Sequence, residues 1–119
     1  APFNNGLDLN TQDDQGVGAI SGLAADNGFF KVGSLRNIAV SAPYMHDGRF
    51  ETLEQVVEHY NSGVRNHPNL SPQLRVAGPN TPPRLLNLTA DEKAGLVAFL
   101  NTLTDPDFLS DARWSDPFE

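Results

Sequence analysis

Hydrophobic positions recur at helical spacing in two stretches of the chain. The first apolar set is Leu53, Val56, Val57 and Tyr60. These positions follow the i, i+3, i+4, i+7 rule, so they share one face of a helix. Thr52 precedes them and Gln55 follows three residues later, which is the capping-box pattern. A helix is therefore predicted over residues 53–60, with Gly63 as the expected stop.

The second stretch predicts a longer helix over residues 90–103. Thr89 is its expected N-cap, and Glu92 completes a second capping box. Its expected buried stripe is Leu96, Phe99, Leu100 and Leu103. A short helical turn is also predicted after Ser71 and Pro72, because proline is favoured at the first helical position.

The rest of the chain is predicted to be loop. Residues 1–34 look irregular, although residues 29–32 have the character of a short strand or an apolar anchor. The tail carries expected apolar anchors at Phe108, Leu109, Trp114 and Phe118. Loops of such length usually serve a function or cover something. The pattern therefore indicates a mostly α, loop-rich fold that wraps a cofactor or a neighbouring domain, as a piece of something larger.

Composition narrows the classes of protein. The chain has 119 residues, the size of one domain or part of one. A formal net charge of −7 argues against nucleic-acid binding, which needs a basic surface. The absence of cysteine removes disulfides, thiolate metal sites and covalent haem attachment within this stretch. No apolar run approaches the roughly 20 residues of a membrane span, and no signal peptide is visible.

Residues 34–48 hold the densest group of chemically useful side chains. His46 can serve as a metal ligand or an acid–base group, or its ring nitrogens can simply bond to the backbone. Met45 is interpreted mainly as a core-filling side chain, although a thioether is also a soft haem ligand.

The residues alone favour ordinary roles for the other histidines and for Tyr60. Tyr60 ends the apolar face of the first helix, so it is expected to be a core tyrosine whose hydroxyl reaches a backbone group. His59 points away from that face and is expected to be exposed. His67 precedes a proline in a loop and is expected at the surface.

An acidic loop over residues 8–14 suggests a second kind of chemistry. Asp8, Asn10 and Gln12 have part of the spacing of a calcium loop. Asp13, however, occupies the position where the sharp turn of such a loop needs glycine. A calcium loop and a solvated surface loop therefore both stay open.

The run from Phe30 to Gly63 reads FKVGSLRNIAVSAPYMHDGRFETLEQVVEHYNSG. It closely resembles the bacterial di-haem cytochrome c peroxidase and MauG family, which typically reads F-K-x-P-S-L-R-N-V-x-x-T-A-P-Y-x-H-D-G and then T-L-E-x-V-V. Residues 3–8, 88–92, 96–104 and 116–118 also resemble that family, so the likeness covers essentially the whole chain. One departure is Gly33, where the family usually has proline.

The resemblance implies a cytochrome c-like haem domain that lacks its attachment segment. Each haem of the family is held by a Cys-x-x-Cys-His motif, and this chain contains none. Residues 1–119 would then be the C-terminal portion of the second cytochrome c-like domain, with the motif upstream. The chain would form the distal wall of the second haem pocket and would hold no catalytic residue of its own.

The resemblance also implies roles for particular residues. The family's far axial ligand lies fourteen residues after the histidine of the H-D-G motif, which is Tyr60 when counted from His46. Peroxidases commonly place Met there and the MauG branch places Tyr, whose phenolate favours ferric iron. His46 would line the pocket. Arg36 would pair with a haem propionate or form a structural salt bridge. The backbone carbonyls of Ser41 and Pro43 would help to bind an inter-haem calcium ion.

The function that the resemblance implies is hydrogen peroxide reduction, or MauG-like oxidation through high-valent haem, with electron transfer between two iron centres. The intact protein would be periplasmic and carry haem c. Its partners would be the upstream haem domain and an electron-donor or substrate protein, while this chain alone would be inactive. Two alternatives stay open: a haem-free periplasmic binding or scaffold module with the same fold, and a small calcium-binding domain that uses the 8–14 loop.

Overall fold

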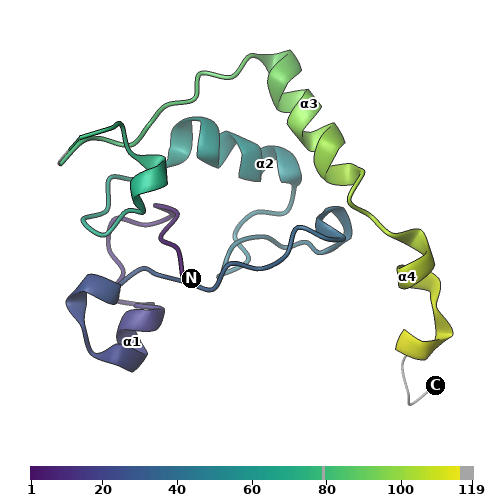
Figure 1. Ribbon diagram of the computed structural model, residues 1–119, viewed down its shortest axis with the longest axis horizontal. Coiled ribbons are helices and arrows are strands. Elements are labelled where there is room, and N and C mark those ends of the chain that lie inside the picture. Colours follow the sequence, from purple (N-terminus) through teal and green to yellow (C-terminus); the bar gives the residue numbers. More distant parts are fainter. Residues whose placement is uncertain (79, 116–119) are drawn as a thin grey trace.

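The computed structural model describes residues 1–78 and 80–115 as short helices joined by long loops (Figure 1). The α-helices are α1 Val17–Ser21, α2 Leu53–Glu58, α3 Ala90–Asn101 and α4 Pro106–Ser110. Single 3-10 turns form at Ala24–Asp26, Ile38–Val40, Pro72–Leu74 and Ala112–Trp114, and a π-helical turn forms at His59–Gly63. Across the described ranges no strand forms, and residues 29–32 contribute only isolated bridges such as Phe3 with Phe30. The mostly helical, loop-rich character is therefore confirmed, whereas α1, within the stretch predicted to be irregular, and α4 were missed.

Helix α2 begins where the sequence predicts. The Thr52 hydroxyl accepts a hydrogen bond from the Gln55 backbone N–H, and the Gln55 side-chain oxygen accepts one from Thr52 N–H. Leu53 and Val57 are buried. After Glu58 the backbone widens into the π-helical turn, a departure that is frequent at functional sites. The last predicted turn therefore exists, but with π rather than α geometry.

Helix α3 has the predicted N-terminus but not the predicted buried stripe. The Thr89 and Glu92 capping box is complete. Leu96 is 43% exposed and Phe99 57% exposed, and none of the residues of α3 is buried. The helix packs against α2, where Lys93 Nζ lies 2.8 Å from Glu58 Oε2. The prediction that these residues are buried is wrong, because the rest of the described chain does not cover that face of the helix.

The predicted apolar anchors of the tail do not enter a core. Phe108 is 45% exposed, Leu109 50% and Trp114 63%, while Phe118 lies outside the described residues. The rings of Phe108 and Trp114 pack together in a tilted arrangement, with their centroids 5.7 Å apart. In Figure 1 the segment that holds α4 runs away from the rest of the chain.

The N-terminal segment is fixed by a buried polar network, which corrects the expectation that His67 lies at the surface. His67 is 5% exposed. Its Nδ1 accepts a hydrogen bond from Asn69 N–H at 3.0 Å and lies 3.2 Å from Asn4 Nδ2. Its Nε2, which must then carry the proton, lies 3.4 Å from Thr11 Oγ1. The expectation failed because the Asn4 segment crosses the 67–71 loop, a contact between distant parts of the sequence.

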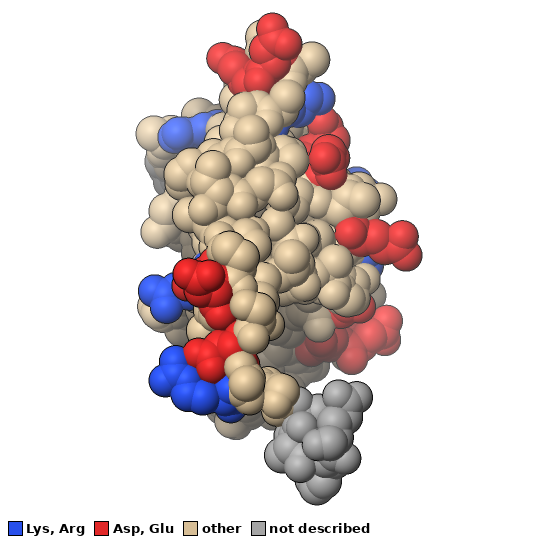
Figure 2. Space-filling model, turned by 90° about the vertical axis from the view of Figure 1, so that its right-hand side faces the viewer, with Lys and Arg blue, Asp and Glu red and all other residues tan. Residues whose placement is uncertain are grey.

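The hydrophobic core of the described residues is small. Its buried members are Leu7, Tyr44, Leu53, Val57 and Leu70. The radius of gyration is 16.7 Å, against about 13.5 Å for a compact domain of this length. The molecule is also flat, with extents of 50 × 40 × 21 Å. In the view onto the narrow side that holds α3 and α4, uncharged residues occupy the middle of the surface, and Asp, Glu, Lys and Arg side chains lie around its edges (Figure 2). None of the described helices has the length and apolar character needed to cross a membrane.

Candidate functional site

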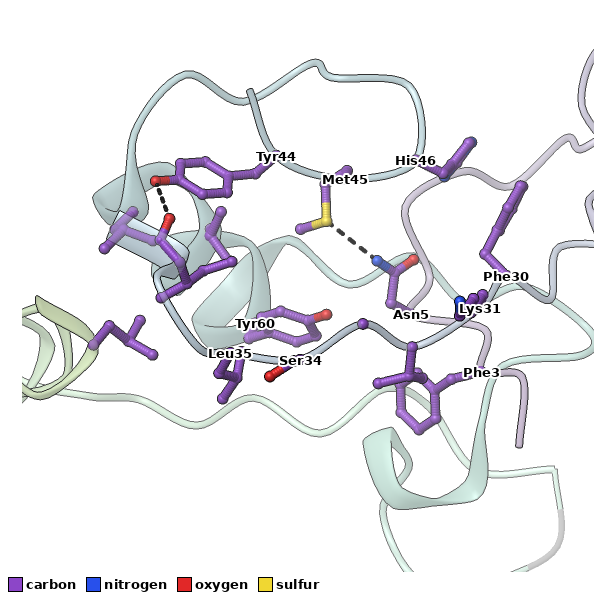
Figure 3. A pocket seen from close by; sticks show the side chains of 16 residues that line it. Phe3, Asn5, Phe30, Lys31, Ser34, Leu35, Tyr44, Met45, His46 and Tyr60 are labelled. Carbon is purple, nitrogen blue, oxygen red and sulfur yellow. Dashed lines mark hydrogen bonds between the residues drawn. The ribbon is translucent and has the colours of Figure 1, made fainter. Parts of the chain in front are cut away.

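A cavity of about 520 Å³ opens between the N-terminal segment, the 30–35 loop, the 44–46 loop and α2 (Figure 3). Such a volume is typical of small-molecule and cofactor sites. Most of its lining is apolar, with a few polar groups among aromatic and aliphatic side chains. The lining residues are Phe3, Asn5, Phe30, Lys31, Val32, Gly33, Ser34, Leu35, Ile38, Tyr44, Met45, His46, Leu53, Val56, Tyr60 and Leu100. Three residues that the sequence analysis discussed, Met45, His46 and Tyr60, therefore meet in one cavity.

Tyr60 enters the cavity from the π-helical turn that follows α2. The side chain is half-buried, and its hydroxyl makes no hydrogen bond to any residue in the described part of the chain (Figure 3). Tyr44 in the same wall is different, because it is buried and its hydroxyl donates to the Ile38 carbonyl at 2.9 Å. The residues alone favoured a core role for Tyr60, with its hydroxyl bonded to the backbone. Tyr44 has that role instead, and the Tyr60 phenol lies free in the cavity.

His59, next to Tyr60, is buried rather than exposed, which corrects the second histidine expectation. It is 6% exposed, and its Nε2 lies 3.0 Å from the Asn5 carbonyl oxygen. Burial lowers the pKa of His59 below 6.5, partly opposed by the bond to Asn5. Its ring meets that of Tyr60 edge-on at 5.1 Å. His59 therefore supports the turn that carries Tyr60.

His46 lies in the wall of the cavity and is held there by stacking. Its ring is parallel to that of Phe30, with the centroids 3.6 Å apart and an interplanar angle of 10°. Its Nε2 lies 3.6 Å from Asp14 Oδ2, and the side chain is 16% exposed. His46 therefore lines this cavity, and its role beside a haem stays a prediction.

Met45 and Asn5 form a polar contact across the cavity wall. Asn5 Nδ2 lies 3.3 Å from Met45 Sδ, and the Asn5 side-chain oxygen accepts a hydrogen bond from Leu7 N–H. Met45 has a φ of 73°, in the left-handed region that residues other than glycine seldom adopt. Sequence reasoning missed Asn5, because the only local signal, an Asn-Asn-Gly turn, says nothing about a residue 40 positions away.

The remaining predicted residues lie away from the cavity lining. Arg36 is exposed, and within the described residues its guanidinium forms no ion pair. Ser41 and Pro43 are exposed at the end of the 3-10 turn, where the Ser41 hydroxyl donates to the Ile38 carbonyl at 2.9 Å. The structure therefore does not bring these three residues into contact with Tyr60.

The acidic loop is tied to the H-D-G segment by Arg49. Its guanidinium binds both oxygens of Asp8, at 3.0 and 2.8 Å, and lies 2.6 Å from an oxygen of Asp47. The hydrogen bond from Arg49 lowers the pKa of Asp47. Asp8, His46 and Asp47 are near enough to one another to hold a metal ion, but Arg49 already neutralises both carboxylates. This arrangement disfavours a calcium loop built on Asp8.

Comparison with solved structures defines the class of fold. The chain matches the crystal structure of a MauG-like protein associated with microbial copper homeostasis, with a TM-score of 0.77 and 36% identity. The match covers 99% of this chain and 39% of that protein. The chain therefore has a MauG-like fold.

Sequence comparison gives the same family. Cytochrome-c peroxidase IdrP2 of Pseudomonas sp. (strain SCT) is 39% identical over 109 residues, or 91% of this chain and 26% of the relative. Methylamine utilization protein MauG of Paracoccus denitrificans is 38% identical over 106 residues, or 77% of this chain and 27% of the relative. No protein-family model matches the chain. The chain is homologous to these cytochrome-c peroxidases and MauG proteins, and it spans about a quarter of their length.

Proposed function

We propose that the chain is the C-terminal portion of the second haem domain of a di-haem, peroxidase-type or MauG-like oxidoreductase. In this proposal a cytochrome c-like haem domain is completed by an upstream Cys-x-x-Cys-His segment, and residues 1–119 form the distal wall of its pocket. The homologous peroxidases and MauG proteins support the reaction class. Because the chain spans only about a quarter of those relatives, the activity belongs to the longer protein, together with its periplasmic location and its electron-donor or substrate partner.

The observation that carries the proposal is the free phenol of Tyr60 in a largely apolar cavity. A haem needs apolar walls for its macrocycle and a ligand atom directed at its iron. Leu35, Ile38 and Val56 supply apolar lining, and Tyr60 supplies an oxygen that no described residue engages. The residues of this chain therefore fit such a group.

Each residue has a stated part in the proposed site. When bound, the haem supplies one-electron redox chemistry. Tyr60 would hold the haem through its phenolate oxygen, a hard donor that would favour the ferric state. The apolar side chains would contact the macrocycle, and His46 would form part of the wall. The exposed guanidinium of Arg36 is available to a propionate, and the carbonyls of Ser41 and Pro43 to a calcium ion shared with the upstream domain.

The test replaces Tyr60 in the full-length holoprotein. Tyr60→Phe removes the ligand oxygen with little change in shape, so the ferric absorption spectrum of one of the two haems should change. Tyr44→Phe is the matched control, because the Tyr44 hydroxyl is already bound to the Ile38 carbonyl, and its spectrum should equal that of the wild type. An unchanged spectrum in Tyr60→Phe would refute ligation by Tyr60. Isolation of the natural gene product without any haem would favour the haem-free scaffold.

A further inference from the structure

The cavity holds a second side chain with a donor atom, and the proposed function does not use it. The chain has one methionine and no cysteine, so Met45 Sδ is its single sulfur atom. That residue lines the same cavity as Tyr60 (Figure 3). Soft thioether sulfur and hard phenolate oxygen are both known axial ligands of haem iron, with opposite redox preferences.

The surroundings of Met45 are not those of a core-filling methionine. The side chain is only half-buried, and it borders open space rather than a packed interior. Its backbone is held at a φ of 73°, a conformation that persists only when the surrounding structure enforces it, and such residues cluster at ligand sites. The loop that follows Met45 is fixed by a turn at Gly48, which has a positive φ, and by the ion pairs of Arg49 with Asp8 and Asp47.

A specific contact also fixes the sulfur itself. Asn5 Nδ2 lies 3.3 Å from Met45 Sδ. Asn5 is held in turn on both sides, since its side-chain oxygen accepts from Leu7 N–H and its carbonyl oxygen faces His59 Nε2 at 3.0 Å. One N–H donor occupies one lone pair of a thioether, which leaves its other lone pair for a metal. Asn5 thus links Met45 to the turn that carries Tyr60.

We propose that Met45 is a second axial-ligand residue of this pocket, and that its thioether binds the haem iron when Tyr60 does not. Asn5 is a positioning residue that holds the sulfur at the cavity wall. The inference rests on the proposed haem site. It adds the soft thioether of Met45 to the hard oxygen ligand of Tyr60. In this exchange the Tyr60 oxygen would leave the iron and take up a proton from solvent water, and the Met45 sulfur would donate a lone pair in its place, with no change in the oxidation state of the iron. The pocket could then hold ferrous iron as well as ferric iron.

The decisive comparison is between Tyr60→Phe and Tyr60→Phe/Met45→Leu in the full-length holoprotein. With Tyr60→Phe we expect low-spin iron, the charge-transfer absorption of a thioether bound to ferric iron, and a midpoint potential above that of the wild type. Met45→Leu keeps the volume but removes the sulfur, so the double variant should become high-spin and lose that absorption. Tyr60→Phe/Val56→Ala is the matched control, because it perturbs the same lining but leaves the sulfur, and it should keep the thioether signature.

A second readout uses imidazole as an added ligand. In Tyr60→Phe imidazole must displace the thioether, whereas in the double variant the position is free. Its dissociation constant should therefore be about tenfold or more higher in the single variant. Should the leucine variant fail to fold, Met45→Ala supplies the same comparison.

Two comparisons keep the two proposals apart. Identical spectra and imidazole affinities in Tyr60→Phe and Tyr60→Phe/Met45→Leu would overturn the role of Met45, whatever Tyr60 does. Identical spectra in the wild type and Tyr60→Phe would instead overturn ligation by Tyr60, and the role of Met45 would still be decided by the first comparison.

Discussion

The two tyrosines of the chain show how one residue type takes opposite roles in one cavity wall. Tyr44 is buried and satisfies its hydroxyl on the Ile38 carbonyl, whereas the hydroxyl of Tyr60 faces the cavity. Helical spacing places Tyr60 on an apolar face and favours the structural role for it. Only the resemblance to a known family assigned it the ligand role, because spacing reports which face a residue occupies and not whether its polar atom finds a partner.

We expect Tyr44→Phe to lower the free energy of unfolding by about 1 kcal/mol, the usual net value of one hydrogen bond. The loss should not be larger, because the Ile38 carbonyl also accepts from the backbone N–H and the hydroxyl of Ser41. Urea unfolding of the wild type and the variant measures the difference. A loss of more than about 3 kcal/mol would show that the ring is repositioned and that more than one bond is lost.

The buried histidines predict a pH dependence of stability. Burial lowers the pKa of His59 below 6.5, and burial also lowers that of His67. The unfolded chain then binds more protons than the folded chain as the pH falls below about 6.5. Folding stability should therefore be fully present above pH 6.5 and decrease below it, by at most about 1.4 kcal/mol per pH unit for each histidine.

Unfolding free energies in urea between pH 7.5 and 5 test this expectation. His59→Gln keeps a side-chain N–H for the Asn5 carbonyl but does not titrate, so it should flatten the slope. An identical slope in wild type and variant would contradict the assignment to His59. Its burial was not predictable from the sequence, because the carbonyl that covers it lies 54 residues away, off the apolar face of α2.

At the level of elements, the sequence predicts where helices begin, but it does not predict which helix faces other parts of the chain bury. Both capping boxes form as predicted, because the Thr and its partner three residues later lie within one turn. The π-helical turn after Glu58 and the exposed stripe of α3 were not predicted. An amphipathic pattern identifies the face that seeks an apolar neighbour, but it does not say whether that neighbour belongs to the same stretch of chain.

In the contact of α2 with α3, the carboxyl group of Glu58 should be unusually acidic. Hydrogen bonds from Lys93, Ser62 and Asn61 lower the pKa of Glu58 from 4.5 to about 2. The contribution of this ion pair should therefore be present above pH 4.5 and disappear as the pH falls toward 2. Both side chains are partly exposed, so added salt should weaken it.

Carbon-detected NMR titration of the Glu58 carboxyl measures this value directly. The midpoint should lie near 2 in the wild type and rise toward 4.5 in Lys93→Ala. Glu54, on the preceding turn of α2, is the internal reference for overall helix loss. A Glu58 midpoint near 4.5 in the wild type would mean that the two helices are not held together by this pair.

At the scale of the whole molecule, the described residues resemble part of a protein interior more than a closed domain. The buried core has five hydrophobic residues, and the radius of gyration exceeds that of a compact chain of this length. The 30–35 and 44–46 loops line the Tyr60 cavity (Figure 3), and what the long loops cover stays a prediction. The mostly helical, loop-rich character was thus predictable from the hydrophobic pattern of the sequence. The low compactness of the chain was not, because it depends on what lies against the exposed apolar faces.

These exposed faces lead to a prediction for the 119-residue chain on its own. Leu96, Phe99 and Trp114 are each more than 40% exposed, and large apolar side chains left open to water in this way favour association with a partner. We expect the isolated chain to bind an apolar fluorescent dye and to self-associate in analytical ultracentrifugation, while still unfolding cooperatively in urea. Extending it with the upstream haem-binding segment of the proposed function should suppress both.

Phe99→Ser should reduce dye binding with little loss of stability, because the ring is not buried. A monomeric chain that binds no dye would show that these faces need no partner, and the inference that an upstream domain covers them would fail.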